Sequence, residues 1–539
     1  MKAPKRLRRF IRPPARHTIL TPGRNCWRID AARDTGLLVD GRDYYRAFYH
    51  SARQAEHSIF IFGWQFDSNA ALLRGEDAAE AQGKITLLEF LNELCESKPT
   101  LRIYMLAWNY SMLYSLDREW FQNWYFNWST NDRLKFCYDS SDSFDASHHQ
   151  KFVVIDGAIG FVGGIDLCAS RWDDRSHRLD NPLRINSGGD SYRTFHDIQS
   201  YHTGPVVRHL AELFQQRWRS VCGECIDLVP TPPQKRPLPF KPSLPLAARK
   251  VAICRTEVPK RRSAGKPVLE IRQLFIDAID AAERLVYMEN QYCSSEALAD
   301  ALIQRMRQRR RPRLQIVLMI AKDAEAFLEQ LSIGIAQSRI IRRLKEAAAE
   351  YGHDLGIYHP ASIAADGSET PTYIHSKLLL IDDRFLSVGS ANMNNRSMGY
   401  DTELNVAWDD LPGSALSDSI RAVRVNLLGE HTGLCGQADN RLGNVSGLVA
   451  YLNALADSGR SRLRQHPARS PTEEYGWLTT LFPNGLPFDS ELVHEAEEQA
   501  VEERHESFIT KGMASLNRLI RSWCAPRDCN SENSRAKTA

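Results

Sequence analysis

The chain has 539 residues, of which 43% are hydrophobic and 25% charged, and its formal net charge is +3. This length suits two domains or two large lobes, and the composition is that of a globular protein, which excludes a disordered or fibrous chain. The near-neutral charge favours no particular partner, and eleven cysteines spread over such a length do not form a disulfide scaffold.

The N-terminus and the charge distribution bear on location. The first twenty residues are basic but lack the apolar stretch of a secretory signal, and no window reaches the ~18 apolar residues of a membrane span. Basic clusters at 6–16, 259–266 and 305–313 are typical of solvated surface, although they would also suit an anionic membrane surface or a polyanion. We therefore expect a soluble protein, cytoplasmic or peripheral to a membrane; export without an N-terminal signal would leave the same sequence.

Short strand-like runs alternate with helical ones on both sides of a proline-rich stretch, residues 229–246, which predicts a semi-rigid linker. Before this stretch the pattern predicts strands at 57–64, 101–108 and 152–157, and helices at 85–97 and 204–221. After it the pattern predicts strands at 285–292, 314–321, 377–382 and 404–410, and helices at 269–283 and 297–308. This alternation indicates an α/β architecture.

One pattern occurs on both sides of the proline-rich stretch. A histidine, a lysine two residues on and an aspartate after four more residues recur as His149, Lys151 and Asp156, and as His375, Lys377 and Asp382. After six further residues, the two copies continue with Gly163-Gly164-Ile165-Asp166 and Gly389-Ser390-Ala391-Asn392. A single copy would be a weak signal, but two copies with the same spacing indicate a duplicated functional unit.

These residues form the HxKxxxxD signature, and the chain resembles the phospholipase D superfamily, in particular its phospholipase D branch. Further matching stretches extend the likeness from about residue 25 to 410: GGIDL at 163–167 with RWDD at 171–174, FHD at 195–197 with GP at 204–205, ENQY at 289–292, and GSANMNNRS at 389–397 with DTELN at 401–405. The resemblance implies an α/β fold of two similar lobes, each a mixed β-sheet flanked by helices. The lobes would be related by a pseudo-twofold axis, with the active site at their interface.

On this basis we expect five parts. They are a basic N-terminal segment (1–24), an N-terminal lobe (25–228), a proline-rich and basic linker (229–266), a C-terminal lobe (267–410) and a C-terminal extension (411–539). The extension carries no motif with chemistry, and within it residues 490–508 predict an amphipathic surface helix.

The spacing within each motif has a physical reason. Side chains alternate between the two faces of a strand, so the histidine and the lysine of H-x-K point the same way, about 7 Å apart along the backbone. The apolar runs FVVI and LLLI that follow would anchor each strand in the core. Two copies that face each other would place two imidazoles on opposite sides of one phosphodiester, as in-line displacement requires.

The resemblance implies covalent catalysis. One histidine attacks phosphorus and forms a phosphohistidine, while the other protonates the leaving alcohol and then activates water or another alcohol. We assign His149 as the nucleophile and His375 as the general acid and base, although the sequence does not distinguish the two. Lys151 and Lys377, with Asn392, would neutralise the phosphoryl oxygens, so neither a metal nor another cofactor is expected at this centre.

Each histidine also needs a carboxylate on its other ring nitrogen, which fixes the tautomer and stabilises the imidazolium. The resemblance implies Asp197 as the partner of His149 and Glu403 as the partner of His375.

The remaining motif residues are expected to support the site. Asp156 and Asp382, at strand ends beside turns, would organise it without touching substrate. Gly164 and Ser390 belong to small pairs that would let the backbone pass close to the phosphate. Asp166 stands where the second copy has asparagine, and an acid beside a phosphate is awkward unless it pairs with a lysine.

Two other groups of residues are open to more than one interpretation. The aromatic segment 108–128 predicts a helix packed on the core, and the resemblance equally allows a lipid contact near the mouth of the pocket. The ENQY stretch at 289–292 would line the pocket or form a strand-to-helix turn. The histidines at 148, 177, 196 and 202 are expected to be pocket or structural residues, because no spacing among them demands a metal.

The leading hypothesis is a phospholipase D, an enzyme that hydrolyses phosphatidylcholine or phosphatidylethanolamine to phosphatidate and free headgroup, with possible transfer to alcohols. Its partner would be phospholipid at a membrane surface, with no nucleic acid, and the chain would be a monomer because both motifs are present. The same site could instead serve cardiolipin synthesis by phosphatidyl transfer, or nucleic-acid phosphodiester cleavage. A non-catalytic phosphate- or lipid-binding protein is a third alternative, against which two complete motifs argue.

Overall fold

The computed structural model describes residues 18–467, with gaps at 109–125, 128, 140–145, 231–236, 259–265, 324–326, 365 and 436–439; the side chains of residues 327–332 are also outside the description. Within these ranges, no helix combines the length and the hydropathy needed to cross a membrane. The predicted surface helix at 490–508 and most of the aromatic segment at 108–128 lie outside the described residues.

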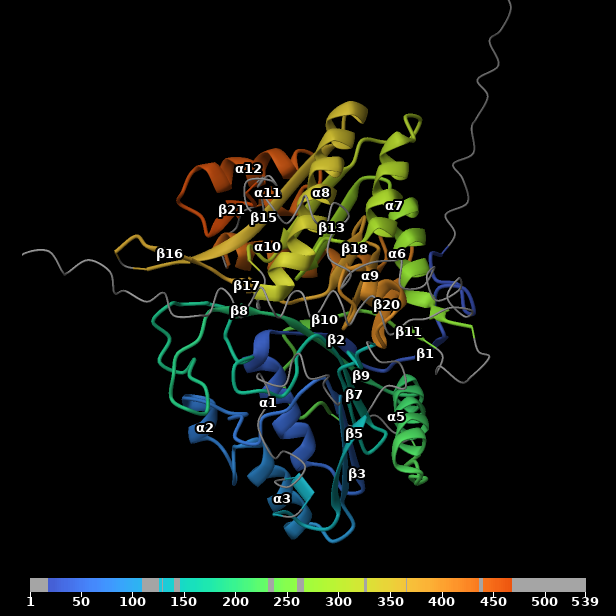
Figure 1. The fold of residues 1–539 in the computed structure, drawn as a ribbon, viewed down its shortest axis with the longest axis vertical. Helices are drawn as coiled ribbons and strands as arrows, with labels where there is room; N and C mark the ends of the chain where they lie inside the picture. Colours follow the sequence, from blue (N-terminus) through green and yellow to red (C-terminus); the bar gives the residue numbers. More distant parts are fainter. Residues whose placement is uncertain are drawn as a thin grey trace, which may run out of the picture. The chain divides into compact units, whose positions relative to one another are not determined.

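The first lobe is built on one mixed sheet (Figure 1). Its strands, in spatial order, are β10 (Leu244–Pro245), β2 (Thr35–Val39), β9 (Ile198–Thr203), β7 (Ile159–Gly163), β6 (Phe152–Ile155), β3 (Ser58–Gly63), β4 (Arg102–Trp108) and β5 (Leu134–Asp139). Its helices are α1 (Asp40–Arg53), α2 (Glu76–Ala79), α3 (Leu87–Ser97) and α5 (Val206–Cys222).

The second lobe contains a larger sheet. The order of its main path is β1 (Arg28–Ala31), β11 (Lys250–Glu257), β20 (Glu403–Asp409), β19 (Phe385–Gly389), β18 (Leu378–Ile381), β13 (Leu285–Asn290), β14 (Gln315–Ile320), β15 (Asp354–Ile363) and β16 (Glu369–Pro371), with β12 (Val268–Leu269) on β11 and β21 (Leu463–Gln465) on β15. Its helices are α6 (Glu270–Ala281), α7 (Glu296–Arg307), α8 (Phe327–Tyr351), α9 (Asn395–Gly399), α10 (Ala415–Thr432), α11 (Asn440–Gly443) and α12 (Leu448–Asp457).

The two sheets repeat one topology. In the first, β9, β7, β6 and β3 are antiparallel neighbours, and β3, β4 and β5 then run parallel. In the second, β20, β19, β18 and β13 are antiparallel, and β13, β14 and β15 run parallel. The two-lobed α/β fold expected from the duplicated motif is therefore confirmed, and each predicted strand and helix that falls in the described ranges is present within a few residues of its expected limits.

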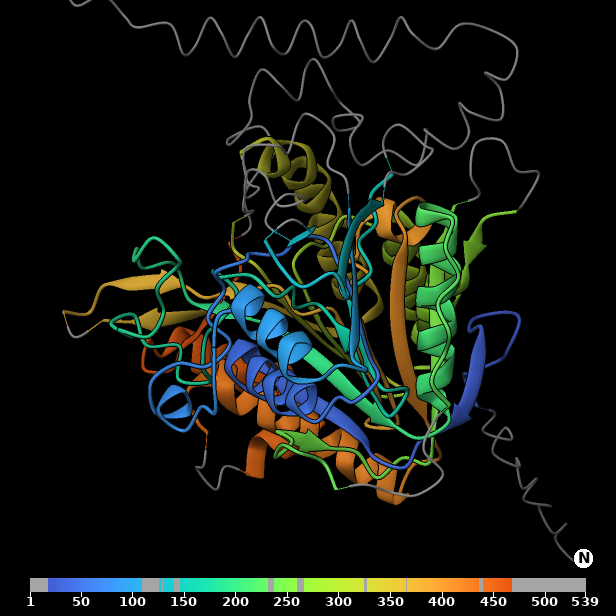
Figure 2. The ribbon, with the colours of Figure 1, turned by 90° about the horizontal axis from the view of Figure 1, so that it is seen from below.

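The layers follow from strands that are apolar on both faces, as in strand β3, where SIFIFG is buried throughout. Phe60 points toward α5, where its ring stacks on that of Phe214 at 4.8 Å, whereas Ile59 and Ile61 pack with α1 and α3. Figure 2 shows α1 and α3 on one side of this sheet and α5 on the other. Side chains of both sheets share the core cluster that contains Phe60, so the lobes bury a common apolar interface.

The lobes do not follow the predicted domain limits. Strand β1, assigned to the first lobe, pairs with β11 of the second sheet, and β10, assigned to the linker, pairs with β2 of the first sheet. Helices α10 and α12 lie beyond the predicted end of the second lobe at 410, yet Ile420 and Leu452 are fully buried in the shared core. These segments join the lobes by strand pairing or by packing against residues distant in the sequence, which local sequence patterns do not reveal.

Candidate active site

The two motifs occupy equivalent places in the two sheets. Each H-x-K immediately precedes the middle strand of its lobe, β6 or β18, whose four residues are all buried. The histidine and the lysine were expected on the strand itself and instead lie just before it, where the buried strand anchors the backbone from which they project. The side chain of His149 is 15% exposed and that of His375 is 8% exposed.

Backbone pairing between the lobes brings the motifs together. In the first motif, the N–H of His149 donates to the carbonyl of Thr402 at 2.9 Å, and the N–H of Thr402 donates to Ser147 at 2.9 Å. In the second motif, strand β17 (Tyr373–Ile374) runs parallel to β8 (Phe195–His196) of the first lobe, and the N–H of His375 donates to the carbonyl of His196 at 2.8 Å. Each motif is thus hydrogen-bonded to the opposite lobe.

This exchange determines which carboxylate meets which histidine. Nδ1 of His149 lies 3.1 Å from both oxygens of Glu403, and Nδ1 of His375 lies 2.6 Å from Oδ2 of Asp197. The four side chains expected to form two dyads do form them, but the expected partners were wrong. Glu403 follows Thr402 and Asp197 follows His196, so each carboxylate belongs to the segment that pairs with the opposite motif. Both carboxylates are fully buried, and the hydrogen bonds of both imidazoles within the described ranges are at Nδ1, which leaves Nε2 for another partner.

The charges of the two motifs act on one another. Burial, followed by the positive charges of Lys377, Arg171 and Lys151, holds the pKa of His375 well below its ordinary value. Burial also lowers the pKa of Lys377 to about 7, against the opposite effect of Asp197. Such a concentration of positive charge in a buried place suits an anion, and a phosphate there would relieve the repulsion.

The two lysines have different neighbours. Nζ of Lys151 lies 3.2 Å from Oδ2 of Asp166, so the acid in place of asparagine does pair with a lysine. Nζ of Lys377 instead lies 3.3 Å from Oε1 of Gln291, in the ENQY stretch. Asn392 is buried, and its Oδ1 has no hydrogen-bond partner among the described residues. Gln291 was singled out in the sequence only through the family likeness, because a glutamine after a strand carries no local signal.

The small residues lie behind the histidines. A Cβ atom added to Gly164 would be 2.3 Å from Oδ1 of Asp197, so only glycine leaves room for that carboxylate. At the equivalent place in the second lobe, the hydroxyl of Ser390 donates to Glu403. We expected these two residues to border the phosphate. In the structure they instead contact the two carboxylates that orient the imidazoles.

The motif aspartates lie at the other end of their strands. Asp156 accepts hydrogen bonds from the N–H groups of three consecutive residues at the start of β3, at 2.7–2.8 Å. Asp382 accepts the same three bonds at the start of β13, at 2.6–2.8 Å. Both residues have positive φ, 49° and 53°. They hold one strand to the next, at the end of the strand opposite the histidine; their role of organising the site without touching substrate stays a prediction.

Aromatic side chains flank each dyad. The Trp64 ring lies 6.4 Å from that of His149 and stacks on Trp108, whereas the Phe195 ring lies 5.3 Å from that of His375. Arg171, whose guanidinium lies 5.0 Å from the Phe195 ring, is a further buried cation of the site. It was missed because an arginine in RWDD has no spacing that ties it to the motifs.

The other histidines considered in the sequence lie outside these dyads. His148 contacts Asp139 and Arg217, and His202 hydrogen-bonds to Thr35 and Ser200. His177 and His196 belong to a separate buried cluster, which is described below.

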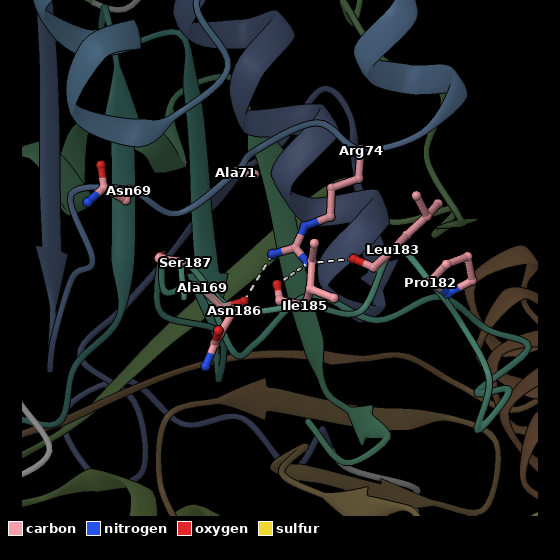
Figure 3. Close-up of a pocket in the computed structure, with 9 residues that line it drawn as sticks. All are labelled: Asn69, Ala71, Arg74, Ala169, Pro182, Leu183, Ile185, Asn186 and Ser187. Atoms are coloured by element: carbon pink, nitrogen blue, oxygen red, sulfur yellow. Dashed lines mark hydrogen bonds between the residues drawn. The ribbon is translucent and has the colours of Figure 1, made fainter. Parts of the chain in front are cut away.

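A pocket between the segments around residues 69–74 and 182–187 does not border the histidines (Figure 3). Its only charged lining side chain, Arg74, donates to the carbonyls of Ala169, Leu183 and Ile185 at 2.6–2.9 Å. These hydrogen bonds of the guanidinium stabilise the loop.

Comparison with known families agrees with this geometry. A family model described as phospholipase D matches residues 51–234, and one described as cardiolipin synthase, PLD-like domain, matches residues 275–421. The chain belongs to the phospholipase D superfamily. Each family match contains one of the two motifs, and together the matches support a phosphodiesterase-type enzyme of the phospholipase D family.

Relatives and solved structures give the extent of the likeness. Phospholipase D1 of Saccharomyces cerevisiae is 25% identical over 69% of this chain and 26% of its own length; phospholipase D alpha 1 of Oryza sativa subsp. japonica is 23% identical over 78% and 68%. The chain thus spans about a quarter of the yeast relative and about two thirds of the rice relative. The crystal structure of phosphatidylserine synthase from Haemophilus influenzae Rd KW20 shares the fold, with a TM-score of 0.50 and 13% identity over 80% of this chain and 96% of that one.

Proposed function

We propose that the protein is a phospholipase D, which hydrolyses a glycerophospholipid such as phosphatidylcholine or phosphatidylethanolamine to phosphatidate and the free headgroup. The observation that carries the proposal is the pair of crossed dyads, each with a buried carboxylate on Nδ1 and each beside a lysine. Two such imidazoles with free Nε2 atoms suit the two faces of one phosphodiester. The names of the relatives support lipid as the substrate class.

In the proposed reaction, Nε2 of His149 attacks phosphorus, and the bond between phosphorus and the headgroup oxygen breaks. His375 gives its Nε2 proton to the departing oxygen. In the second step His375 takes a proton from water, the water oxygen attacks phosphorus, and the bond to His149 breaks. Phosphatidate leaves, and both histidines return to their starting states.

The charges around the site fit this assignment. Lys151 and Lys377 would neutralise the phosphoryl oxygens as charge builds up on them, with Asn392 as an amide donor. The bound phosphate would also offset the cations that lower the pKa of His375, so that this histidine can carry the proton that the leaving alcohol needs. Glu403 and Asp197 would keep each imidazole in the tautomer that leaves Nε2 available.

Phosphatidyl transfer is a second candidate, because the fold is shared with a phosphatidylserine synthase and the second lobe matches a model described as cardiolipin synthase, PLD-like domain. In that reaction an alcohol replaces water in the second step, and the same residues act on it.

The test is an incubation of the pure protein with phosphatidylcholine and phosphatidylethanolamine vesicles labelled in the headgroup, with and without a primary alcohol. Plasmid DNA is incubated in parallel. Headgroup release with phosphatidate as the product supports the phospholipase, and phosphatidyl-alcohol as the dominant product favours the transferase. Nicked DNA without lipid turnover would refute both. His149→Asn and His375→Asn should each abolish turnover and leave the circular dichroism spectrum unchanged.

A further inference from the structure

A second cluster of ionisable side chains lies beneath the dyad of His375. It contains Asp40 at the start of α1, His177 in the loop before β8, His196 in β8, and Glu430 near the end of α10. All four are buried, and one ligand atom from each lies within 4.8 Å of the others. The cluster shares no residue with the catalytic dyads.

The distances between these atoms match the edges of a metal coordination shell. Nδ1 of His196 lies 2.8 Å from Oε1 of Glu430 and 3.0 Å from Oδ1 of Asp40; Nε2 of His177 lies 3.1 Å from Oε1 of Glu430 and 3.5 Å from Oδ2 of Asp40. Four ligands at about 2.0–2.1 Å from Zn²⁺ in a tetrahedron are about 3.3 Å from one another. The four distances are close to this value, and one ligand atom from each residue lies within 4.8 Å of the others, so a small dication fits among them once the side chains adjust.

The outer partners of the cluster are those that metal ligands require. The second nitrogen of His177, Nδ1, lies 3.0 Å from Oδ2 of Asp173, and the second nitrogen of His196, Nε2, lies 3.1 Å from Oε2 of Glu289. The other oxygen of Glu430 accepts a hydrogen bond from Arg175 at 2.6 Å. A carboxylate behind each ligating histidine fixes the tautomer that presents the ring nitrogen to a metal.

Asp40 gives an independent indication. Its side chain is fully buried, and within the described part of the chain its Oδ2 accepts no hydrogen bond, its nearest ion-pair partner being Nε2 of His177 at 3.5 Å; a buried carboxylate oxygen without a hydrogen bond is costly. Arg175 pairs with Glu430 and Arg184 pairs with Asp173, whereas the ion-pair partners of Asp40 and Glu289 among the described residues are histidines, which carry a charge only when protonated. A dication at the cluster would satisfy the orphaned oxygen and balance both charges.

We propose that Asp40, His177, His196 and Glu430 bind a structural divalent transition-metal ion, for which Zn²⁺ has the matching size and donor preference. This proposal does not rest on the proposed function. The ion would join the first lobe to α10 of the second. It would also fix His196, whose carbonyl accepts the N–H of His375 and whose neighbour Asp197 orients that imidazole. The ion is thus a positioning element and takes no part in the reaction.

The first experiment is elemental analysis by mass spectrometry of the full chain, purified without chelators from cells grown with Zn²⁺, Mn²⁺, Fe²⁺ and Co²⁺. We expect one transition-metal ion per chain, a fall in the unfolding temperature when a strong chelator removes it, and recovery when Zn²⁺ is added back. The Co²⁺-loaded protein should show the visible absorption of a four-coordinate site with nitrogen and oxygen ligands. Protein that neither contains a transition metal nor binds Zn²⁺ in equilibrium dialysis would overturn the proposal.

Variants locate the ion. His177→Gln and Glu430→Gln should each lose it, and Asp173→Asn should weaken Zn²⁺ affinity by about 10–100-fold, measured by competition with a chromophoric chelator. The matched control is His202→Asn, because His202 is equally buried in the first lobe but hydrogen-bonds to hydroxyl groups only. It should keep the metal. Metal content that is unchanged in both ligand variants would refute the site.

The alternative to a bound metal ion is that both histidines of the cluster are protonated. Although burial opposes it, the charges of Asp40 and Asp173 raise the pKa of His177 to about 9 in the absence of metal, and an imidazolium there would balance the same carboxylates. Because this pKa lies above the ordinary 6.5, the stabilisation would be complete below pH 6.5 and lost as the pH rises through 9. Protein that binds no Zn²⁺ in equilibrium dialysis, and whose unfolding free energy falls over this pH range, would contain a protonated network in place of the metal and would overturn the proposal.

Discussion

Nδ1 of His149 lies 3.1 Å from both carboxylate oxygens of Glu403, a residue of the opposite lobe 254 positions further along the chain. The reciprocal pair joins His375 to Asp197, at 2.6 Å. Neither lobe therefore holds a complete dyad from its own residues. The site exists only when the lobes are docked, because the segments that carry the carboxylates form backbone hydrogen bonds with the segments that carry the histidines.

The crossed pairing predicts which variants resemble one another. With a substrate whose leaving group needs no proton, such as a p-nitrophenyl phosphodiester, formation of the phosphohistidine requires only the nucleophile and its partner. We expect His149→Asn and Glu403→Gln to lose the rapid burst of p-nitrophenol. His375→Asn and Asp197→Asn should keep the burst and lose the slow phase. With a phospholipid, both carboxylate variants should lose about 10⁴-fold in kcat, as when the aspartate of a catalytic triad is replaced.

The grouping itself is the control for that experiment. If Asp197→Asn, and not Glu403→Gln, removed the burst, then Asp197 would be the carboxylate that serves the nucleophile, and the pairing of His149 with Glu403 would not apply to the reaction. If the phosphoryl group were found on His375 by peptide mapping, the roles of the two histidines would be reversed while the pairing remained.

The pKa of Lys377 predicts a pH dependence. Burial lowers this pKa to about 7, and only the charged ammonium neutralises the phosphate. Since the protonated form is active, kcat/KM should fall as the pH rises above about 7, because this ratio reports the free enzyme. In Lys377→Arg the guanidinium stays charged, so this decrease in kcat/KM at alkaline pH should disappear, even though the maximal rate is lower. If the decrease in kcat/KM at alkaline pH were unchanged in this variant, another ionisable group would be responsible for it.

Gly164 predicts an effect on kcat without loss of binding. In Gly164→Ala the new methyl group would meet Oδ1 of Asp197 at 2.3 Å and displace the carboxylate that orients His375. We expect kcat to fall by about 10–100-fold, the loss that is typical when a residue that orients a metal ligand is replaced. KM should change little, because the carboxylate does not touch substrate. The matched variant is Gly223→Ala at the end of α5, where a Cβ atom meets nothing within 4 Å. It should keep full activity, and any loss of stability from its positive φ of 72° is measured separately by thermal unfolding.

Asp156 predicts a loss of stability with the chemistry preserved. Its carboxylate accepts three backbone N–H groups, and Asp156→Asn would turn an amide NH₂ toward some of them. Leaving a buried donor unpaired costs about 1–3 kcal/mol, so the free energy of unfolding should fall by about that amount in urea titrations. Asp382→Asn should behave alike, because its three bonds are equivalent.

The kinetic measurement separates this structural role from a catalytic one. At a temperature where both variants are folded, kcat and its pH profile should match those of the unaltered protein. An exposed loop variant, Asp366→Asn, serves as the control for stability, since the hydrogen bonds to its carboxylate, within the described ranges, come from nearby Ser368. A kcat reduced by orders of magnitude in folded Asp156→Asn would place this residue in the reaction.

The sequence alone determined the parts of the site that depend on local structure. A histidine and a lysine two positions apart beside an apolar strand are expected to point the same way, and the duplication of this spacing predicts two equivalent lobes. The first expectation follows from the period of a β-strand and the second from the repeat, and neither needs knowledge of distant contacts. The organising role of Asp156 and Asp382 was predicted for the same reason, because each stands at the turn that ends its strand.

Tertiary structure decided everything that joins distant segments. The partner of each histidine was predicted wrongly because the choice depends on how the two lobes dock, and Asp197 and Glu403 are equally plausible partners by sequence. The cluster of Asp40, His177, His196 and Glu430 has no regular spacing, since its members come from a helix start, a loop, a short strand and a helix end. Such sites are specified by packing, which brings residues together without leaving a period in the sequence.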